Sequence, residues 1–109
     1  MSNNSHKISV IMATYNSAKT LEDSINSVLS QTYNNLEFLI LDDSSDDKTY
    51  EILNQYKILD SRIKIFTNNR NLGLTKSLNL LLKEAKGYFI ARQDADDRSH
   101  PERLQTQIN

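Results

Sequence analysis

Short apolar runs alternate with polar breaks and amphipathic stretches along almost the whole chain. Four of these runs are rich in β-branched or aromatic residues and have the length of strands: residues 8–13, 36–41, 63–66 and 88–91. The first is nearly continuous in its apolar character, which is typical of a central parallel strand covered on both faces. The third alternates between apolar and polar residues, so we expect it at an edge of the sheet.

Between the strands, apolar residues recur at helical spacing. In residues 18–31 the spacing i, i+4, i+7, i+8 predicts an amphipathic helix, and Ser17 is its candidate N-cap. The apolar stripe of this helix consists of Leu21, Ile25, Val28 and Leu29. A second helix is predicted over residues 48–59, with a stripe of Ile52, Leu53 and Tyr56 and with Ser45, Asp46 and Asp47 at its capping positions.

The clearest helical stripe lies in the second half of the chain. It consists of Leu74, Leu78, Leu81, Leu82 and Ala85. Gly73 or an adjacent asparagine before this stripe is expected to supply a positive φ, and Gly87 after it is expected to be a C′ residue. A last helix is predicted to follow a cap at Ser99, with Pro101 in its first turn.

The order of these elements predicts an α/β fold. Strands that alternate with helices form a mainly parallel sheet, and right-handed crossovers place helices on both of its faces. We expect residues 1–109 to form a single partial domain, with residues 1–6 as a flexible leader. The last helical stripe stops where the chain stops, which indicates a truncated design. We expect an edge strand and an uncovered apolar face to favour self-association.

Composition narrows the classes of function. Lys and Arg number 13 against 14 for Asp and Glu, so no broad positive field favours nucleic acid or an anionic membrane. The chain has no cysteine, which excludes disulfides and thiolate zinc sites. Its apolar runs are far shorter than a membrane span, so we expect no membrane segment in this chain and a cytoplasmic location.

Acidic residues directly follow two of the predicted strands. Asp42 and Asp43 follow the second strand, and Asp94 and Asp96 follow the fourth. Unpaired ionised carboxylates are too costly to bury in an apolar interior, so they must face water or a metal. Asp94 and Asp96 are two positions apart and point the same way on an extended backbone, where they can share one divalent cation with phosphate oxygens. The alternative is a solvated turn, and Asp97 is expected to cap the segment that follows.

The polar breaks are expected to meet in one crevice. In open parallel sheets, ligands bind beyond the carboxyl ends of the strands, where the strand order reverses. Residues 14–16, 42–43 and 94–96 all lie at such ends. Carboxylates repel phosphate, so a bound phosphate requires a bridging cation such as Mg²⁺ or Mn²⁺. With two glycines in the chain, neither a dinucleotide-binding fingerprint nor a P-loop is present.

Six motifs in register give the chain a family resemblance. They are residues 9–16, 29–33, 41–45, 71–73, 93–97 and 101–104. Together they resemble the N-terminal half of a family 2 glycosyltransferase with the GT-A fold, whose nucleotide-binding half is Rossmann-like. The resemblance runs from about Lys7 to the last residue.

The resemblance implies transfer of a sugar from a nucleotide-diphospho-sugar, expected to be a UDP-sugar, to a glycan or lipid-linked acceptor. It implies dependence on Mg²⁺ or Mn²⁺ and a role in polysaccharide or related glycan synthesis. Carried over to this chain, the nucleotide-binding residues are Ala13, Thr14, Tyr15, Asp42, Asp43 and Asp94, and the metal ligands of this D-x-D motif are Asp96 and Asp94. Tyr15 and the backbone of the two residues before it would lie against the base. Asp43 would accept a hydrogen bond from the base.

The resemblance also implies what this chain lacks. In inverting members of the family the general base and most of the acceptor pocket follow the D-x-D region, so we assign no catalytic residue here. We expect the donor-binding half of an enzyme, inactive alone, whose full-length form works in the cytoplasm at the inner face of the membrane. Two alternatives stay open: a non-catalytic nucleotide-binding module, and a phosphoryl-transfer or receiver-type domain. The latter places its acidic pair after the first strand, which here ends in Thr14, Tyr15 and Asn16.

Overall fold

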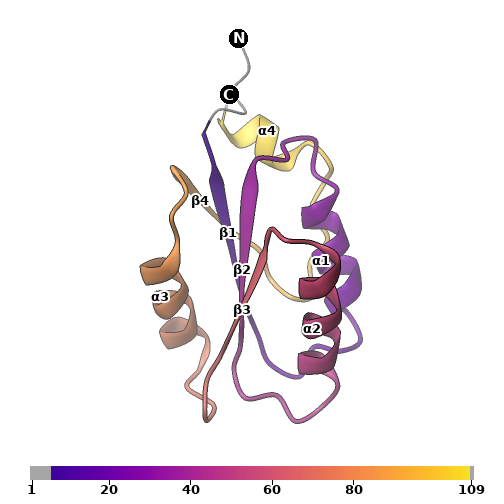
Figure 1. Cartoon of the computed structure of the whole chain (residues 1–109), viewed down its shortest axis with the longest axis vertical. Helices are drawn as coiled ribbons and strands as arrows, with labels where there is room; N and C mark the ends of the chain where they lie inside the picture. Colours follow the sequence, from indigo (N-terminus) through magenta and orange to yellow (C-terminus); the bar gives the residue numbers. More distant parts are fainter. Residues whose placement is uncertain (1–5, 109) are drawn as a thin grey trace.

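The computed structural model describes residues 6–108 and shows a four-stranded, fully parallel sheet with helices on both faces (Figure 1). The strands are β1 (Ile8–Thr14), β2 (Leu36–Asp42), β3 (Ile63–Thr67) and β4 (Phe89–Arg92). The helices are α1 (Leu21–Leu29), α2 (Thr49–Leu59), α3 (Leu74–Glu84) and α4 (Arg103–Ile108). The predicted α/β class is therefore confirmed. Most of the expected leader, residues 1–5, lies outside the described residues.

The strand order is β3-β2-β1-β4, and it places the reversal point at β1. The chain moves outward from β1 through β2 to β3, then crosses back and adds β4 on the other side of β1. This confirms the predictions of a central first strand and an edge third strand. Because all pairs are parallel, with Thr14 opposite Asp42 and Ile11 opposite Arg92, the carboxyl ends of all four strands point to one edge.

The two faces of the sheet are covered unequally. Among residues 6–108, helices α1 and α2 pack on one face and α3 alone on the other, as Figure 1 shows. The larger core contains Val10, Met12, Leu21, Ile25, Val28, Phe38, Ile40, Leu53 and, from α4, Leu104. The smaller core on the α3 side contains Ile11, Leu39, Leu41 and Leu81. The side of the sheet that carries α1 is therefore the better packed of the two.

The predicted stripe of α3 is wrong at its margins. Leu81 is fully buried, and Leu78 and Ala85 pack beside it, but Leu74 and Leu82 are about half exposed. The reason is that α3 has no neighbouring helix on its face of the sheet among residues 6–108, so it buries one narrow side. By contrast, the stripe of α2 is confirmed, with Leu53 buried and its predicted partners packed against the larger core.

Three predicted helix boundaries also need correction. Helix α1 begins after Thr20 rather than Ser17, because the Ser17 carbonyl accepts from the backbone N–H groups of Thr20 and Leu21 in a preceding turn. Helix α4 begins at Arg103, so Pro101 lies in a turn before it. Gly87 is not a left-handed C′ residue: a Cβ there would lie 2.5 Å from the Ser9 nitrogen, so close approach to β1 is what requires glycine.

The prediction for Gly73 is confirmed, and the predicted capping of α2 is confirmed in part. Gly73 has a φ of +92° immediately before α3, as predicted. At the start of α2, Lys48 occupies the N-cap position without a side-chain bond, but the Asp47 carboxylate accepts from the Thr49 N–H at 2.9 Å. Of the three proposed caps of α2, Asp47 therefore contacts the helix start, while the Ser45 side chain bonds to the Asp42 carboxylate.

The outer edge at β4 is apolar. Tyr88, Phe89 and Ile90 expose 71%, 37% and 47% of their surfaces, and the His6 ring stacks on Tyr88 with centroids 4.4 Å apart. Self-association through this edge stays a prediction. Within residues 6–108, no helix has both the length and the apolar character that crossing a bilayer requires.

Candidate functional site

The carboxyl ends of β1 and β2 are bound directly to each other. The Asp43 N–H donates to the Thr14 carbonyl at 2.9 Å, which extends the parallel pairing by one residue. Beyond it, the Asn16 N–H donates to Ser45 Oγ at 2.9 Å. Asn16 has a φ of +49°, a conformation that asparagine tolerates better than most residues. The polar breaks after the first and second strands therefore form one surface.

The loop after β4 is tied to the same surface through α1. Thr20 Oγ1 donates to the Ala95 carbonyl at 2.9 Å, and Ser24 Oγ donates to the Asp94 carbonyl at 2.8 Å. Both donors lie at the start of α1, which itself follows the break at the end of β1. The three segments that sequence reasoning expected to meet thus leave the same edge of the sheet.

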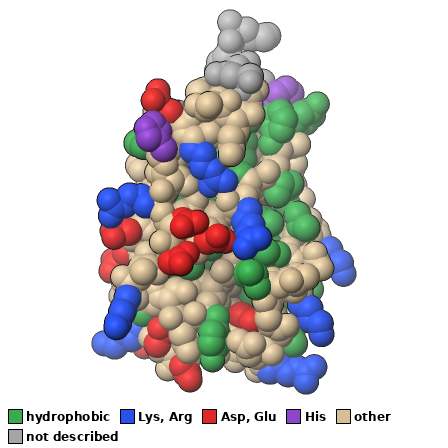
Figure 2. All heavy atoms as spheres, turned by 180° about the vertical axis from the view of Figure 1, so that it is seen from behind, with side chains coloured by type: hydrophobic (Ala, Val, Ile, Leu, Met, Phe, Trp, Pro, Cys, Tyr) green, Lys and Arg blue, Asp and Glu red, His purple; other side chains and the backbone are tan. Residues whose placement is uncertain are grey.

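Three carboxylates come together in the loop after β4. Asp94, Asp96 and Asp97 each place a carboxylate oxygen within 4.8 Å of those of the other two; Asp94 is half-buried and the others are exposed. Octahedral Mg²⁺ binds oxygens at about 2.1 Å, so its ligands lie at most about 4.2 Å apart. A small inward adjustment would let these oxygens share such a cation. Figure 2 shows a group of acidic side chains near the middle of one face of the molecule, with basic side chains around it.

Asp97 belongs to this group rather than to a helix cap. Its N–H closes a turn on the Asp94 carbonyl at 3.1 Å, and α4 begins six positions later. The prediction that Asp97 caps the segment that follows is therefore wrong, because residues 98–102 separate it from the start of α4. Its carboxylate instead lies beside those of Asp94 and Asp96.

Positive side chains adjoin the acidic group. Arg92 Nε donates to Asp94 Oδ1 at 3.0 Å, and both side chains are about half exposed. A hollow next to them is lined by Arg92, Gln93, Asp97, Arg98, Ser99, His100 and Arg103. The neighbourhood of the carboxylates is thus of mixed charge, which reduces its net repulsion of an anionic ligand.

Asp43 has a different environment from the acids after β4. It is only 4% exposed, and its carboxylate accepts from the backbone N–H groups of Leu72 (2.8 Å) and Gly73 (2.9 Å) and from Asn68 Nδ2 (2.8 Å). Burial by itself raises the pKa of the Asp43 carboxyl, but these three hydrogen bonds together outweigh it and leave the pKa below its ordinary value. The Asp43 side chain therefore holds the loop between β3 and α3.

Asp42 is engaged in its own turn. Asp42 Oδ1 accepts from both the N–H and the hydroxyl of Ser45, across Ser44, which has a φ of +64°. Neither Asp42 nor Asp43 contributes to the group of three carboxylates after β4. The two acidic breaks thus lie at the same edge but do not form one ligand set.

The residues at the end of β1 are open to a ligand in different ways. The Tyr15 side chain is 48% exposed, and Ala13 is half-buried. Thr14 is buried, and its Oγ1 has no hydrogen-bond partner among residues 6–108. A buried hydroxyl without a partner is uncommon in folded proteins, so this strand end has unused hydrogen-bonding capacity.

Sequence reasoning missed the polar residues that support the acidic loop. Ser24 is completely buried within the apolar stripe of Leu21, Ile25 and Val28, and Gln93 is 2% exposed directly before Asp94. A small polar residue inside an apolar stripe was a readable signal at position 24. The partners of Gln93 on α1 and α4, Ser24 and Arg103, could not be read, because they lie far from it or on a separate element.

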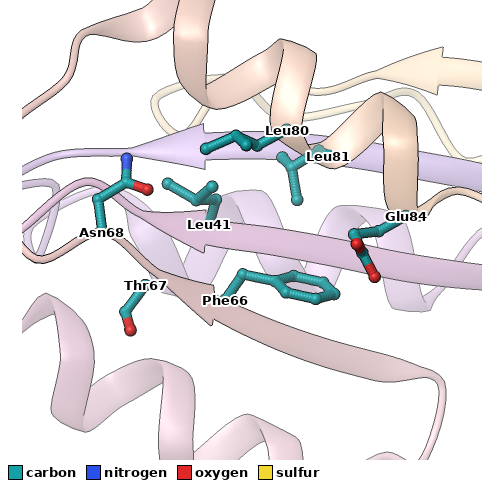
Figure 3. Close-up of a pocket in the computed structure, with 7 residues that line it drawn as sticks. All are labelled: Leu41, Phe66, Thr67, Asn68, Leu80, Leu81 and Glu84. Atoms are coloured by element: carbon teal, nitrogen blue, oxygen red, sulfur yellow. The ribbon is translucent and has the colours of Figure 1, made fainter.

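A separate pocket lies on the α3 side of the sheet (Figure 3). It has a volume of about 200 Å³ and is lined by Leu41, Phe66, Thr67, Asn68, Leu80, Leu81 and Glu84. Typical ligand pockets have volumes of about 300–1,000 Å³. This pocket is small and mostly apolar, and it contains none of the predicted site residues. It is a packing gap beside α3 rather than a competing site.

Comparison with known proteins places this architecture in a family. The model of the family described as glycosyl transferase family 2 matches residues 9–109. EpsE of Bacillus subtilis is 48% identical over 107 residues, covering 97% of this chain and 38% of that protein. The Escherichia coli protein WfaP, a UDP-Glc:α-D-GlcNAc-diphosphoundecaprenol β-1,3-glucosyltransferase, is 44% identical over 102 residues, covering 94% of this chain and 40% of that protein.

Solved structures agree on the fold. Residues 1–349 of S. aureus TarS in complex with UDP-GlcNAc superpose with a TM-score of 0.87 at 33% identity, covering 94% of this chain and 30% of that one. A mannosyltransferase of Pyrobaculum calidifontis, solved with GDP-Man and Mn²⁺, has the same TM-score at 22% identity and covers 96% of this chain and 32% of that one. The chain thus spans well under half the length of these relatives.

Proposed function

The chain belongs to glycosyl transferase family 2, and from this premise we propose that it forms the donor-binding half of an enzyme that transfers a sugar from a nucleotide-diphospho-sugar to an acceptor hydroxyl. The proposed donor is a UDP-sugar, because WfaP uses UDP-Glc and TarS binds UDP-GlcNAc. The proposed acceptor is a glycan or a lipid-linked sugar, since WfaP acts on a diphosphoundecaprenol-linked one. The product then belongs to polysaccharide or related glycan synthesis.

The single observation that carries the proposal is the group of carboxylates at the reversal point of the sheet. Asp94, Asp96 and Asp97 lie within 4.8 Å of one another at the edge where the ends of β1 and β2 also lie. Such a group does not attract a diphosphate by itself. Oxygen ligands at this spacing suit Mg²⁺ or Mn²⁺, which Asp94 and Asp96 would hold and which would supply positive charge beside a diphosphate.

Each predicted site residue has a proposed role. Asp96 and Asp94 hold the divalent cation, and the Tyr15 ring lies against the base beside the backbone of Ala13 and Thr14. Asp43 accepts a hydrogen bond from the base, with Asp42 close by. A carboxylate has about four lone-pair sites, two on each oxygen. Within the chain, Asp43 Oδ1 accepts two hydrogen bonds and Oδ2 accepts one. The remaining site on Oδ2 suffices for one donor from a base.

The chemistry asked of these residues is binding and orientation. When bound, the divalent cation supplies positive charge to the diphosphate that leaves as the glycosidic bond breaks. The Asp94 carboxylate is already oriented by Arg92, and the end of β1 offers the Tyr15 ring beside the Thr14 hydroxyl, which has no hydrogen-bond partner within residues 6–108. The acceptor hydroxyl needs a base to take its proton, and we assign that base to no residue of this chain. We propose that the isolated chain binds the donor without turnover.

A thermal-shift panel tests the proposal. UDP-, GDP-, CMP- and dTDP-sugars are compared with and without Mn²⁺ on the purified chain. We expect a uridine diphosphate ligand to raise the melting temperature only with metal, by about 10 °C at a hundredfold excess over its dissociation constant. The Asp96→Ala variant should lose this shift. The control variant Glu84→Ala removes an exposed carboxylate at the C-terminal end of α3 and should keep the shift in melting temperature.

One result of the thermal-shift panel would contradict the proposed metal site. Equal stabilisation by UDP with and without Mn²⁺, unchanged in Asp96→Ala, would reject the metal-bridged site. The proposal extends to a cytoplasmic enzyme that works at the inner face of the membrane when its acceptor is lipid-linked. Fractionation of the producing cells checks that part separately.

A further inference from the structure

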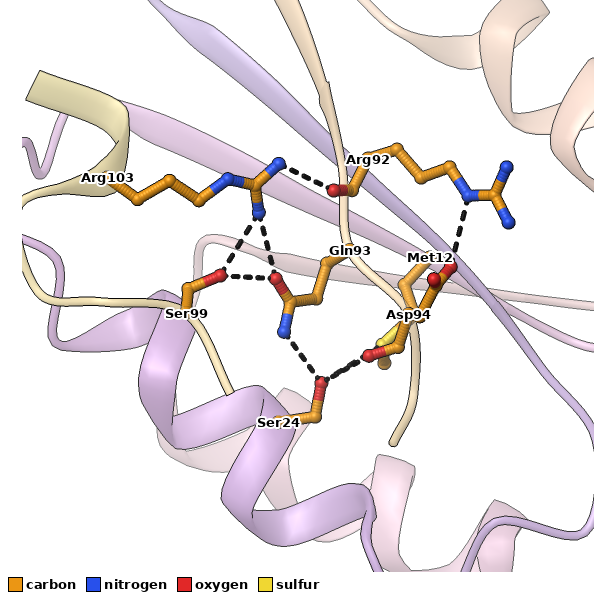
Figure 4. A network of polar contacts seen from close by, with 7 residues as sticks. All are labelled: Met12, Ser24, Arg92, Gln93, Asp94, Ser99 and Arg103. Atoms are coloured by element: carbon orange, nitrogen blue, oxygen red, sulfur yellow. Dashed lines mark hydrogen bonds and ion pairs between the residues drawn. The ribbon is translucent and has the colours of Figure 1, made fainter. Parts of the chain in front are cut away.

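We propose that Thr20, Ser24 and Gln93 are positioning residues that hold the acidic loop after β4 in a shape ready for a divalent cation. The inference rests on the proposed function, because it takes Asp94 and Asp96 as the ligands of that cation. It concerns residues that touch neither the metal nor the nucleotide in that proposal. Figure 4 shows the network of polar contacts around Gln93 and Ser24.

The loop is held by its backbone carbonyls. Ser24 Oγ donates to the Asp94 carbonyl at 2.8 Å, Thr20 Oγ1 to the Ala95 carbonyl at 2.9 Å, and Gln93 Nε2 to the Asp97 carbonyl at 3.0 Å. Three of the four carbonyls from position 94 to position 97 therefore accept a side-chain donor. The carboxylates on the same backbone make no bond to these donors and remain available to a ligand.

Gln93 is the centre of the network. It is 2% exposed, and its side-chain amide uses its full hydrogen-bonding capacity. Nε2 donates to Ser24 Oγ (3.0 Å) and to the Asp97 carbonyl, while Oε1 accepts from Arg103 (2.9 Å) and from the Ser99 hydroxyl. Arg103 also donates to the Arg92 carbonyl at 2.7 Å. A fully satisfied buried network of this kind is rigid, and it joins α1, the end of β4 and α4.

The cost of gathering like charges explains why such rigidity matters here. Two unit charges about 4 Å apart repel by about 1 kcal/mol even in bulk water, and more strongly near a protein surface. Three carboxylates on a flexible loop would separate, and a cation would then have to draw them together. A loop that is fixed by hydrogen bonds to its backbone keeps the carboxylate oxygens of the three acids within 4.8 Å of one another before any cation binds. Groups that orient ligands in this way commonly change metal affinity by about 10–100-fold when they are removed.

The chain supplies matched variants for a test. Thr20→Val and Ser24→Ala each remove one hydroxyl donor to the loop with little change in volume. Thr20→Ser keeps the donor, and Ser30→Ala removes a hydroxyl at the far end of α1 that donates to the Asn26 carbonyl and does not contact the loop after β4 in the described part of the chain. Mn²⁺ affinity is measured by calorimetry at saturating UDP, and melting temperature is measured without metal. We expect Thr20→Val and Ser24→Ala to bind Mn²⁺ about tenfold more weakly or worse, and both controls to match the wild type.

Gln93→Glu separates positioning from electrostatics. This change keeps the shape and the Oε1 acceptor but replaces the Nε2 donor, so the bonds to Ser24 and to the Asp97 carbonyl are lost. It also adds a negative charge beside the carboxylates, which by attraction alone would strengthen binding of a cation. We expect Mn²⁺ binding to weaken. Tighter binding in Gln93→Glu would overturn the inference.

The two proposals fail in different ways. If the wild-type chain shows no metal-dependent UDP binding, the proposed function is wrong and the inference falls with it. If the wild type binds Mn²⁺ and UDP but Thr20→Val and Ser24→Ala bind Mn²⁺ as tightly, only the positioning inference is wrong. A loss of metal affinity in Ser30→Ala equal to that in Ser24→Ala would also overturn it, because the effect would then not depend on contact with the loop.

Discussion

At the end of β2 the Asp43 carboxylate is buried and accepts three hydrogen bonds from the chain, whereas at the end of β4 the carboxylates of Asp94, Asp96 and Asp97 face one another near the surface. In sequence these two ends have the same pattern, an apolar strand followed by acids. In the fold, Asp43 binds backbone N–H groups and the Asn68 side chain, whereas the carboxylates of the later group stay near the surface.

The difference follows from what passes over each strand end. The loop between β3 and α3 crosses the end of β2, where the Asn68 N–H donates to the Asp42 carbonyl at 3.1 Å. It therefore brings the Leu72 and Gly73 N–H groups to the Asp43 carboxylate. Strand β4 lies at the edge of the sheet, and within residues 6–108 the loop after it is supported from below by α1. Whether an acid at a strand end is bonded within the chain or stays near the surface thus depends on which segment covers that strand end.

The largest expected contrast is in stability. Asp43→Ala leaves two backbone N–H groups and the Asn68 amide without their acceptor, and should lower the free energy of unfolding by about 2–4 kcal/mol. Asp96→Ala removes an exposed side chain and should change it by less than about 0.5 kcal/mol. Urea unfolding of the metal-free chain, followed by circular dichroism, measures both. Equal destabilisation by the two variants would remove the distinction between the two strand ends.

Acid sensitivity sharpens the same contrast. The folded-state pKa of Asp43 lies below its ordinary value of 3.8, because the hydrogen bonds from Leu72, Asn68 and Gly73 outweigh the opposing effect of burial. A lowered folded pKa means that the carboxylate stabilises the fold above the unfolded value, and that this contribution is lost as pH falls below about 3.8 toward the folded value. We expect the unfolding free energy to decline in this range.

Asp43→Asn should make that decline less steep, and unfolding free energies measured from pH 7 to pH 2.5 check it. Glu37 adds a second contribution to the decline. Burial raises its pKa, but hydrogen bonds from Ser9, Lys86 and Lys64 leave the pKa below its ordinary value of 4.5. An Asp43→Asn chain that loses stability as steeply as the wild type would show that the Asp43 carboxylate is not held as the structure indicates.

The smallest effect is expected at the end of β1. Thr14→Val replaces a buried hydroxyl that has no partner within residues 6–108 by a methyl group of similar size, and should raise the unfolding free energy by about 1 kcal/mol. Because the proposed contact of Thr14 with the base is through its backbone, UDP affinity should stay within about twofold of the wild type. Calorimetry with UDP and Mn²⁺ measures this. A large loss of affinity would mean that the hydroxyl contacts the nucleotide.

Much of the fold followed from local pattern. The existence and order of the eight helices and strands within residues 6–108, the central place of β1 and the edge position of β3 were predicted, because strand and helix periodicities depend on residues close together in sequence. The errors lie where distant contacts decide. Leu74 and Leu82 fit the helical spacing but lie outside the narrow buried side of α3, and close approach to Ser9, rather than a helix cap, requires Gly87.

The candidate site divides in the same way. Sequence alone determined that acids follow two strands of a parallel sheet and that Asp94 and Asp96 are near enough to share a cation, since both facts depend on spacing along one segment. Only the tertiary structure decided that Asp43 is buried under the loop before α3 while the later acids stay open. The tertiary structure also decided that Ser24 and Gln93 support the loop after β4. These facts depend on strand order and on which loop covers which strand end, and such contacts join residues far apart in the chain.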